Sequence, residues 1–291
     1  MSEHLTDEQI HNVIQGIRVP PQPQIMVDLQ MEQAMPDPDI EQIARLIRQD
    51  VSLSGMMLKF VNSPFLRHSN QISSIEQAVA LLGPTTVINI INGLSIKGEM
   101  SDQAIRAMTR FWDTATDIAQ VSAHIAKAIG AKNPDESYAL GLFHNAGIPL
   151  MMERFDNYDD VMTESYAGDD CRVIDVENRV LNTNHAVVGY YVAKSWNLPR
   201  QLCDVIAEHH NVEQVFAHSG TRAQERKTLL ATLKIAEHIC GNFAILGQQD
   251  VDHEWQRMGA DMLLHTGLGS FDIEEMVGNF RDMGIAVYCN Y

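Results

Sequence analysis

The sequence predicts an all-α protein. Apolar residues recur every three or four positions through most of the 291-residue chain, which is the spacing that places them on one face of a helix. Asp and Ser, which cap helix starts, precede several of these segments, and Gly or Pro follows some of them. Hydrophobic residues make up 45% of the chain and charged residues 20%, so the apolar content is sufficient for a substantial core.

The first hundred residues contain two helix starts. The proline-rich segment 19–24, VPPQPQ, favours an extended linker. After it, Asp37 can cap a helix whose first position is Pro38. Ser74 and Gln77 have the spacing of a capping box for another helix.

Helices continue through the rest of the chain. A long one is expected from about 104 to 130, and Ser270 can cap another in the tail. The remaining predicted helices are 136–153, 172–182, 185–196, 200–210 and 226–246. The acidic segment 153–171 is expected to be a solvated helix and loop, and the final residues, GIAVYCNY, favour a short strand.

Charge and cysteine content restrict the class of protein. A net charge of −17 argues against a general attraction to nucleic acid or to an anionic membrane surface. The N-terminus has no signal-peptide pattern, and no apolar stretch approaches the roughly 20 residues of a membrane span. The four cysteines form no CxxC pair and no disulfide framework. We expect a cytoplasmic protein.

Several His and Glu side chains fall on the apolar faces of predicted helices. Burying such groups costs free energy unless they find partners. His144, for example, lies four residues after Leu140 and four before Ile148. The others in such positions are Glu177, His185, His209 with His210 beside it, and Glu237. If their helices pack together, five helices direct a His or Glu toward one interior.

Two interpretations fit this pattern. The side chains could converge on a metal ion, since imidazole and carboxylate are common ligands. They could equally be core residues, each histidine hydrogen-bonded to a carbonyl or a carboxylate. No His pair has the HExxH spacing of a helical zinc site, so spacing alone does not decide between them.

The chain also resembles a known family. The run at 50–83, DVSLSGMMLKFVNSPFLRHSNQISSIEQAVALLG, resembles the N-terminal signature of the HDOD family, the HD-related output domains of bacterial signalling proteins. FWDTATDIA, YALGLFHNAGIPLM, NHAVVGYYVAKSWNLP and IAEHH then follow the HD-like half of that family in order. The resemblance implies an HD-like helical bundle preceded by a smaller helical subdomain. We expect an N-terminal subdomain at 1–103, the bundle at 104–246 and a C-terminal helical extension at 247–291.

The same resemblance assigns positions to the candidate site. Related HD phosphohydrolases hold divalent metal with a His, a His-Asp pair and a final Asp. Here Thr114 stands for the first His, His144 and Asn145 for the pair, and Glu237 for the final Asp. His185, His209 and His210 resemble the additional histidines of the HD relatives that cleave cyclic dinucleotides. The GYP continuation of those enzymes is absent here.

The two replacements weigh against hydrolysis. In a metal hydrolase a carboxylate neutralises the charge of the metal, and the metal lowers the pKa of bound water toward about 7. Asn145 offers an amide oxygen without charge, and Thr114 offers no imidazole. We therefore expect no resident cofactor. The open alternative is a weakly bound divalent metal at His144, His185, His209, His210 and Glu237; candidates to line a ligand pocket are Thr114, Asn145 and Glu177.

Two functions from different classes follow. The first is a non-catalytic signal-transduction module that acts by binding a protein partner or a small ligand, with no nucleic acid or membrane partner. The second is a divergent metal-dependent phosphohydrolase that acts on a nucleotide or a phosphodiester. An oligomeric scaffold, with copies of the chain as partners, is a further possibility.

Overall fold

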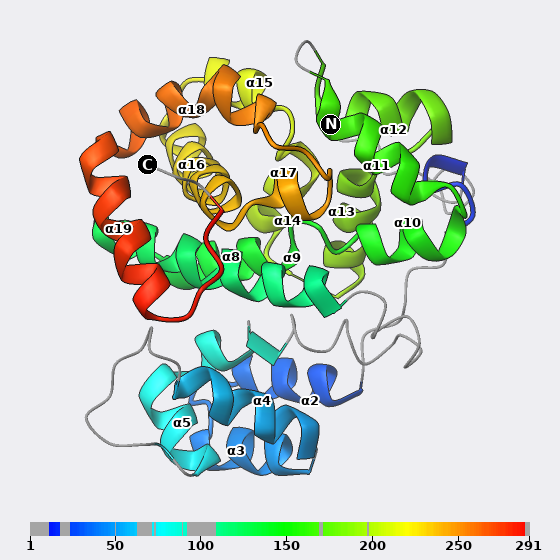
Figure 1. Ribbon diagram of the computed structural model, residues 1–291. Coiled ribbons are helices and arrows are strands. Elements are labelled where there is room, and N and C mark those ends of the chain that lie inside the picture. The colour runs from blue at the N-terminus through cyan, green and yellow to red at the C-terminus, as the bar shows by residue number, and fades with distance from the viewer. Residues whose placement is uncertain are drawn as a thin grey trace. The chain divides into compact units, whose positions relative to one another are not determined.

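The computed structural model describes residues 12–17, 24–49, 51–62, 72, 74–88, 90–91, 109–168, 171–196 and 198–288. The predicted all-α class is confirmed, because the residues described in these ranges form helices and turns and contain no strand (Figure 1). The chain divides into two compact units. Residues 21–107 form the smaller unit, and residues 1–20 with 108–291 form the larger one.

The smaller unit is built from α2 (Gln24–Gln33), α3 (Ile40–Arg48), α4 (Val51–Val61) and α5 (Ile75–Leu82). α3 packs against the other three helices and buries Ile43, Ala44 and Ile47, as its apolar stripe predicts. The predicted cap at Asp37 is wrong. Asp39 caps α3 instead, and its side chain accepts a hydrogen bond from the Glu41 backbone N–H at 2.8 Å.

Ser74 does cap α5, where its hydroxyl oxygen accepts a hydrogen bond from the Gln77 backbone N–H at 3.2 Å. The predicted linker at 19–24 lies outside the described residues except for Gln24, which begins α2.

The larger unit holds the candidate site. Its helices are α8 (Thr109–Ala128), α9 (Pro134–Phe143), α10 (Ile148–Arg154), α11 (Tyr158–Ala167), α12 (Val173–Leu181), α13 (His185–Ser195), α14 (Arg200–Glu208), α15 (Val212–Ala217), α16 (Thr221–Cys240), α17 (Asn242–Ile245), α18 (His253–Thr266) and α19 (Ser270–Asp282). α16 packs against α8, α9, α14 and α18 (Figure 1). It therefore connects most of the elements that carry polar side chains into the interior.

The helix predicted at 136–153 is two helices. α9 ends at Phe143, residues 144–147 form turns, and α10 begins at Ile148. The physical reason lies at Gly147, where a Cβ atom would come 2.1 Å from the carbonyl oxygen of His185. The chain turns here so that its backbone can approach α13 closely, and His144 stands at the C-terminal end of α9 rather than within a helix.

Three other details of the sequence prediction are wrong. The helix predicted at 226–246 breaks at Gly241, whose φ of +75° is left-handed. The acidic segment is not merely solvated, because α11 buries Tyr158 and Tyr166 and packs against α12. In the tail, Gly269 rather than Ser270 is the cap of α19.

The strand predicted for the last residues is also absent from the described part, 285–288. That segment is extended, and its Tyr288 backbone N–H donates to the carbonyl of Ile239 at 3.0 Å. Among the described helices, none combines the length and the apolar character required to cross a bilayer.

Candidate functional site

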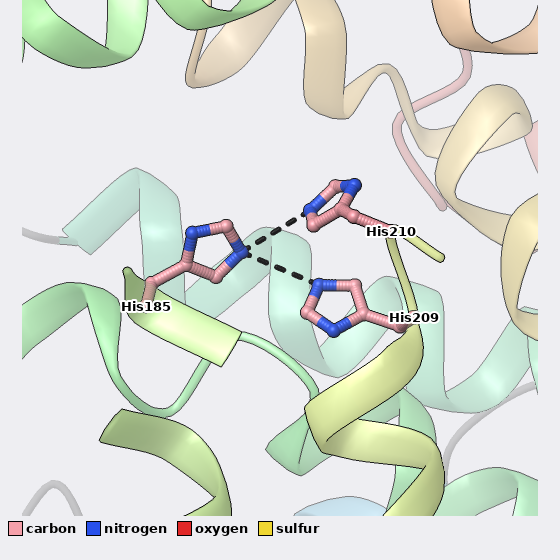
Figure 2. A group of neighbouring side chains, drawn as sticks. All are labelled: His185, His209 and His210. Carbon is pink, nitrogen blue, oxygen red and sulfur yellow. Dashed lines mark hydrogen bonds between the residues drawn. The ribbon is translucent and has the colours of Figure 1, made fainter. Parts of the chain in front are cut away.

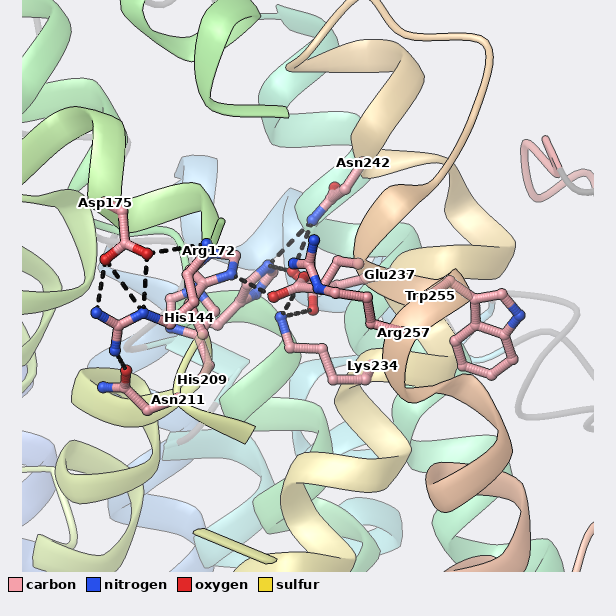
Figure 3. Close-up of polar contacts among 12 residues, drawn as sticks. His144, Arg172, Asp175, His209, Asn211, Lys234, Glu237, Asn242, Trp255 and Arg257 are labelled. Atoms are coloured by element: carbon pink, nitrogen blue, oxygen red, sulfur yellow. Dashed lines mark hydrogen bonds and ion pairs between the residues drawn. The ribbon is translucent and has the colours of Figure 1, made fainter. Parts of the chain in front are cut away.

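The fold brings together six of the side chains that the sequence placed on apolar faces. His144, Glu177, His185, His209, His210 and Glu237 each expose 6% of their surface or less. The four histidines lie at helix ends. His144 and His209 are C-terminal caps of α9 and α14, His210 follows His209, and His185 is the first residue of α13. Helix ends let these side chains reach the interior, where Figure 3 shows His144 and His209 on the same side as Glu237 and Lys234.

Local sequence fixes His185 at its helix start. The preceding Asn184 caps α13, and its side-chain oxygen accepts a hydrogen bond from the Val187 backbone N–H at 2.9 Å. Nδ1 of His185 lies 2.7 Å from Oε2 of Glu177, and the Tyr158 hydroxyl donates to Oε1 of the same carboxylate at 2.5 Å. Both oxygens of the fully buried Glu177 are therefore engaged.

His209 and His210 are each held through Nδ1. Nδ1 of His209 lies 2.7 Å from the carbonyl oxygen of Ile206, and Nδ1 of His210 lies 2.8 Å from Oε1 of Glu254. Burial, reinforced by neighbouring positive charge that includes Lys234, holds the pKa of each of these histidines well below its usual value. Both rings are consequently neutral at physiological pH.

The Nε2 atoms of three histidines converge. Nε2 of His185 lies 3.3 Å from Nε2 of His209 and 3.2 Å from Nε2 of His210, as Figure 2 shows. One ligand atom from each ring lies within 4.8 Å of the other two. Among the described residues this is a group whose spacing suits a shared cation.

His144 belongs to a separate contact on the α16 side. Its Nδ1 lies 2.7 Å from the carbonyl oxygen of Gly141, and its Nε2 lies 3.3 Å from Oε1 of Glu237. The side-chain amide of Asn242 donates to the same Glu237 oxygen at 3.0 Å. Both ring nitrogens of His144 thus contact protein oxygens.

Lys234 is the functional residue that the sequence prediction missed. Its ammonium group, 3% exposed, lies 2.8 Å from Oε2 of Glu237 and 2.9 Å from Oε2 of Glu254. Burial alone lowers the pKa of Lys234, but the two carboxylates more than offset this and raise it above its usual value. Conversely, burial alone raises the pKa of Glu237, but Lys234 and then His144 outweigh it, so this pKa lies well below its usual range.

Two further predicted residues, Thr114 and Asn145, are also buried. Thr114 is buried on α8, a helix that packs against α9 and α16. Asn145 is 2% exposed, and its side-chain oxygen has no hydrogen-bond partner among the described residues. These two positions do not supply the imidazole and the carboxylate that an HD metal centre would require.

Two cavities border the cluster. A cavity of about 20 Å³ is lined by residues that include Lys234, Glu237 and Glu254, which is room for a single water molecule. A second cavity of about 300 Å³ is lined by residues that include His210, Arg172 and Cys171. The side of the cluster at Lys234 therefore adjoins little free volume, whereas the His210 side adjoins a larger cavity.

These residues do not fit the HD hydrolytic centre. That centre requires carboxylates to balance divalent charge, and here Glu237 already pairs with a buried ammonium. The neutral amide of Asn145 adds no charge. In this arrangement Glu237 contacts the buried ammonium of Lys234 and the ring of His144.

Comparison with known proteins gives a consistent result. The sequence model of the HDOD domain matches residues 19–212. An uncharacterised protein from Treponema pallidum (strain Nichols) is 26% identical over 219 residues, which are 75% of this chain and 41% of that protein. The cyclic di-GMP phosphodiesterase CdgJ from Vibrio cholerae is 38% identical over 71 residues, 24% of this chain and 16% of that protein. The chain therefore spans less than half the length of these relatives.

A solved structure shares the fold. The crystal structure of an HDOD domain protein of unknown function from Geobacter sulfurreducens superposes with a TM-score of 0.64. It is 21% identical in sequence, and the match covers 94% of this chain and 92% of that one.

Proposed function

Because this chain belongs to the HDOD family, we propose that it is a non-catalytic signal-transduction module that acts by binding a protein partner or a small ligand. The family match supports a signalling-associated module related to HD proteins.

The observation that carries the proposal is the buried ion pair between Lys234 and Glu237. In a hydrolytic centre the final carboxylate binds a divalent cation, which then acidifies water. Here the ammonium of Lys234 is already 2.8 Å from that carboxylate. Since like charges repel strongly in a low-dielectric interior, this cation opposes the binding of a metal at the same oxygen.

The size of the adjoining space also argues against a substrate bound at Glu237. A nucleotide or phosphodiester requires a pocket of roughly 300–1,000 Å³. The cavity beside Lys234 and Glu237 measures about 20 Å³. The larger cavity of about 300 Å³ lies beside His210 instead, so a small ligand would meet the histidines rather than Glu237.

The alternative function is a divergent metal-dependent phosphohydrolase. What favours it is the retention of four buried histidines and the adjoining cavity at His210. We rank it second because the positions that would balance the charge of a catalytic metal carry Thr114, Asn145 and a lysine-paired Glu237.

The compartment and assembly belong to the same proposal. We infer a cytoplasmic protein, because Cys171 and Cys203 carry free thiols, as expected in a reducing environment. Copies of this chain are possible partners, and light scattering on a size-exclusion column measures that state directly.

A turnover assay tests the proposal. Purified protein is incubated with Mn²⁺ or Mg²⁺ and with nucleoside phosphates, cyclic dinucleotides and a chromogenic phosphodiester, beside the His144→Ala variant. We expect product at the level of the protein-free control for both proteins. Turnover in the natural protein that disappears in His144→Ala would overturn the proposal in favour of the hydrolase.

A second experiment tests the role in binding. His144, Asn145, His185 and His209 are replaced together by apolar residues of similar volume, and partner or ligand binding is compared with that of the natural protein. The proposal expects binding or signalling output to fall. Unchanged binding and output in a folded variant would show that these buried polar groups serve only to hold the helices.

A further inference from the structure

The three converging histidines pose a hydrogen-bonding problem. Nδ1 of His185 faces a carboxylate, Nδ1 of His209 faces a backbone carbonyl, and Nδ1 of His210 faces another carboxylate. Each of these groups can only accept a hydrogen bond, so each Nδ1 carries the proton. In a neutral ring the Nε2 atom is then a lone-pair acceptor.

Three acceptors therefore face one another. Nε2 of His185 lies 3.3 Å and 3.2 Å from the corresponding atoms of His209 and His210, and no proton separates them while the rings are neutral. Protonating one ring would provide a single N–H for two acceptors, which leaves a buried lone pair unsatisfied at a cost of about 1–3 kcal/mol. A cation that all three nitrogens share satisfies the whole group.

We propose that His185, His209 and His210 bind one divalent transition-metal ion through their Nε2 atoms. His144 and Glu237, which stand at the His-Asp and final Asp positions, take no part in this site, because they contact each other instead. It is independent of the proposed function, since a bound metal can order the helix ends whether or not the protein catalyses a reaction.

The spacing of the nitrogens suits tetrahedral coordination. With Zn–N bonds of about 2.05 Å at tetrahedral angles, neighbouring nitrogens lie about 3.3 Å apart. The two measured separations from His185 are 3.3 Å and 3.2 Å. The start of α13 and the end of α14 therefore hold these nitrogens near the spacing of metal ligands, and a fourth position is left for water or another ligand.

The partners at Nδ1 are those of a metal-binding histidine. Such histidines usually donate their other ring N–H to a carboxylate or a backbone carbonyl, which orients the ring and raises its basicity. Glu177, the Ile206 carbonyl and Glu254 occupy these three positions. A core histidine needs one such partner, but three rings that are all anchored at Nδ1 and all aimed at one point fit coordination better.

Local charge supports a dication. The contacts around the cluster join three carboxylates, those of Glu177, Glu237 and Glu254, to one ammonium, that of Lys234. The carboxylates outnumber the ammonium three to one, and carboxylates without a cation are costly away from water. A divalent ion at the three nitrogens balances them, and it approaches through the cavity that His210 lines.

The ligand type selects the metal. Imidazole nitrogens suit Zn²⁺, Fe²⁺, Ni²⁺ and Cu²⁺, whereas Mg²⁺ and Ca²⁺ prefer oxygen. We therefore expect Zn²⁺ and Co²⁺ to bind the chelator-treated protein, and Mg²⁺ not to compete with them.

The test uses the full chain after dialysis against a chelator. ZnCl₂ is added, and bound zinc is measured by elemental analysis and by competition with a chromogenic chelator. We expect one equivalent, an upward shift of the melting temperature, and the visible spectrum of tetrahedral cobalt when Co²⁺ replaces Zn²⁺. Less than a tenth of an equivalent, with no thermal shift, would overturn the inference, and this measurement needs no variant.

Matched variants locate the ion. His209→Gln should weaken zinc binding by about 100-fold or more, while His265→Gln, which replaces a partly buried histidine that contacts Thr228 outside the cluster, should leave it within about threefold. Glu177→Gln, which alters an outer partner, should cost about 10–100-fold. Equal zinc affinity in His209→Gln and the natural protein would place the ion elsewhere.

The outcomes separate this inference from the proposed function. Zinc without phosphodiester turnover supports both. Zinc with turnover overturns the non-catalytic function and leaves the three-histidine site intact. A protein that binds no zinc and shows no turnover overturns the site alone.

Discussion

The ammonium of Lys234 lies 2.8 Å from Oε2 of Glu237, one turn further along α16. Both side chains are buried, and a second carboxylate, that of Glu254 on α18, lies 2.9 Å from the same ammonium. The lysine therefore links two helices through charge. Its ammonium group also supplies the positive charge next to Glu237 that a divalent cation would supply in a metal centre.

Removing this ammonium should destabilise the fold. Lys234→Met keeps the apolar stem but leaves Glu237 and Glu254 buried without their cation, and breaking a buried ion pair typically costs about 3–5 kcal/mol. We expect a loss of about 3 kcal/mol in the free energy of unfolding, measured by urea denaturation. Lys132→Met, at an exposed lysine whose nearest carboxylate oxygen is 3.9 Å away, should change it by less than about 0.5 kcal/mol.

A double variant separates the ion pair from the shape of the side chain. Lys234→Met combined with Glu237→Gln removes both charges, so it should recover part of the lost stability. If the double variant is as unstable as the sum of the single ones, the two charges do not interact as described.

Periodicity predicted which residues face inward, but not how they pair. Glu177, His185 and Glu237 were identified because each follows an apolar stripe, and all three are buried. Lys234 was missed although it lies three residues before Glu237 and four after Leu230, on the same face. Lysine is seldom fully buried, so only a pairing with distant acids could have suggested it.

Glu254, one of the two carboxylates that pair with Lys234, lies in a segment without a recognisable motif. Glu254 lies in the tail beyond the family resemblance, yet it anchors both His210 and Lys234. Helix breaks are a second feature that local sequence does not predict, because the turn at 144–147 depends on contact with α13. Local sequence cannot report such a contact between segments some forty residues apart.

The contact at Gly147 can be tested by adding one methyl group. In Gly147→Ala the new Cβ would lie 2.1 Å from the His185 carbonyl oxygen, so the backbone of the turn or of α13 must move. We expect a loss of about 3 kcal/mol of stability, at the upper end for overpacking. Gly189→Ala is the matched control, since its Cβ would come closest to the side chain of Ile206, at 3.2 Å, and would lie at ordinary contact distances of 3.5 Å or more from the neighbouring backbone atoms. Equal losses in both variants would contradict the close backbone approach.

The hydroxyl of Tyr158 should stabilise the buried Glu177. It donates to Oε1 of the carboxylate at 2.5 Å, and burial first, then the negative charge of Glu177, holds the pKa of Tyr158 well above its usual value. Tyr158→Phe removes this donor without changing the ring, which should cost about 2 kcal/mol. Thermal melting of both variants measures the loss of stability. Tyr288→Phe, at a residue that is 45% exposed, should lose almost none.

Acid should selectively remove the contribution of Asp175. The hydrogen bond from Arg172 lowers the pKa of Asp175 below 3.8 despite partial burial, and Arg172 also bonds Asn211. A lowered pKa means that the folded state favours the charged carboxylate, so the stabilisation is present above pH 3.8 and disappears as the pH falls through the lowered pKa. Asp175→Asn should therefore be less stable than the natural protein at pH 7, by under about 1 kcal/mol because the pair is partly exposed. A difference that persists unchanged at the lowest pH at which both proteins stay folded would refute this origin.

Restoring the missing carboxylate should not restore a metal centre. Asn145→Asp places a carboxylate at a 2% exposed position whose side-chain oxygen has no partner among the described residues. Desolvation should raise the pKa of the new carboxyl, so the variant should be destabilised by about 3 kcal/mol at pH 7 and by less at lower pH, where the group is protonated. Because Lys234 still pairs with Glu237, we expect neither phosphodiester turnover nor stabilisation by Mg²⁺ or Mn²⁺. A melting temperature that rises with Mg²⁺ in Asn145→Asp but not in the natural protein would show that this position can still complete a metal site beside His144.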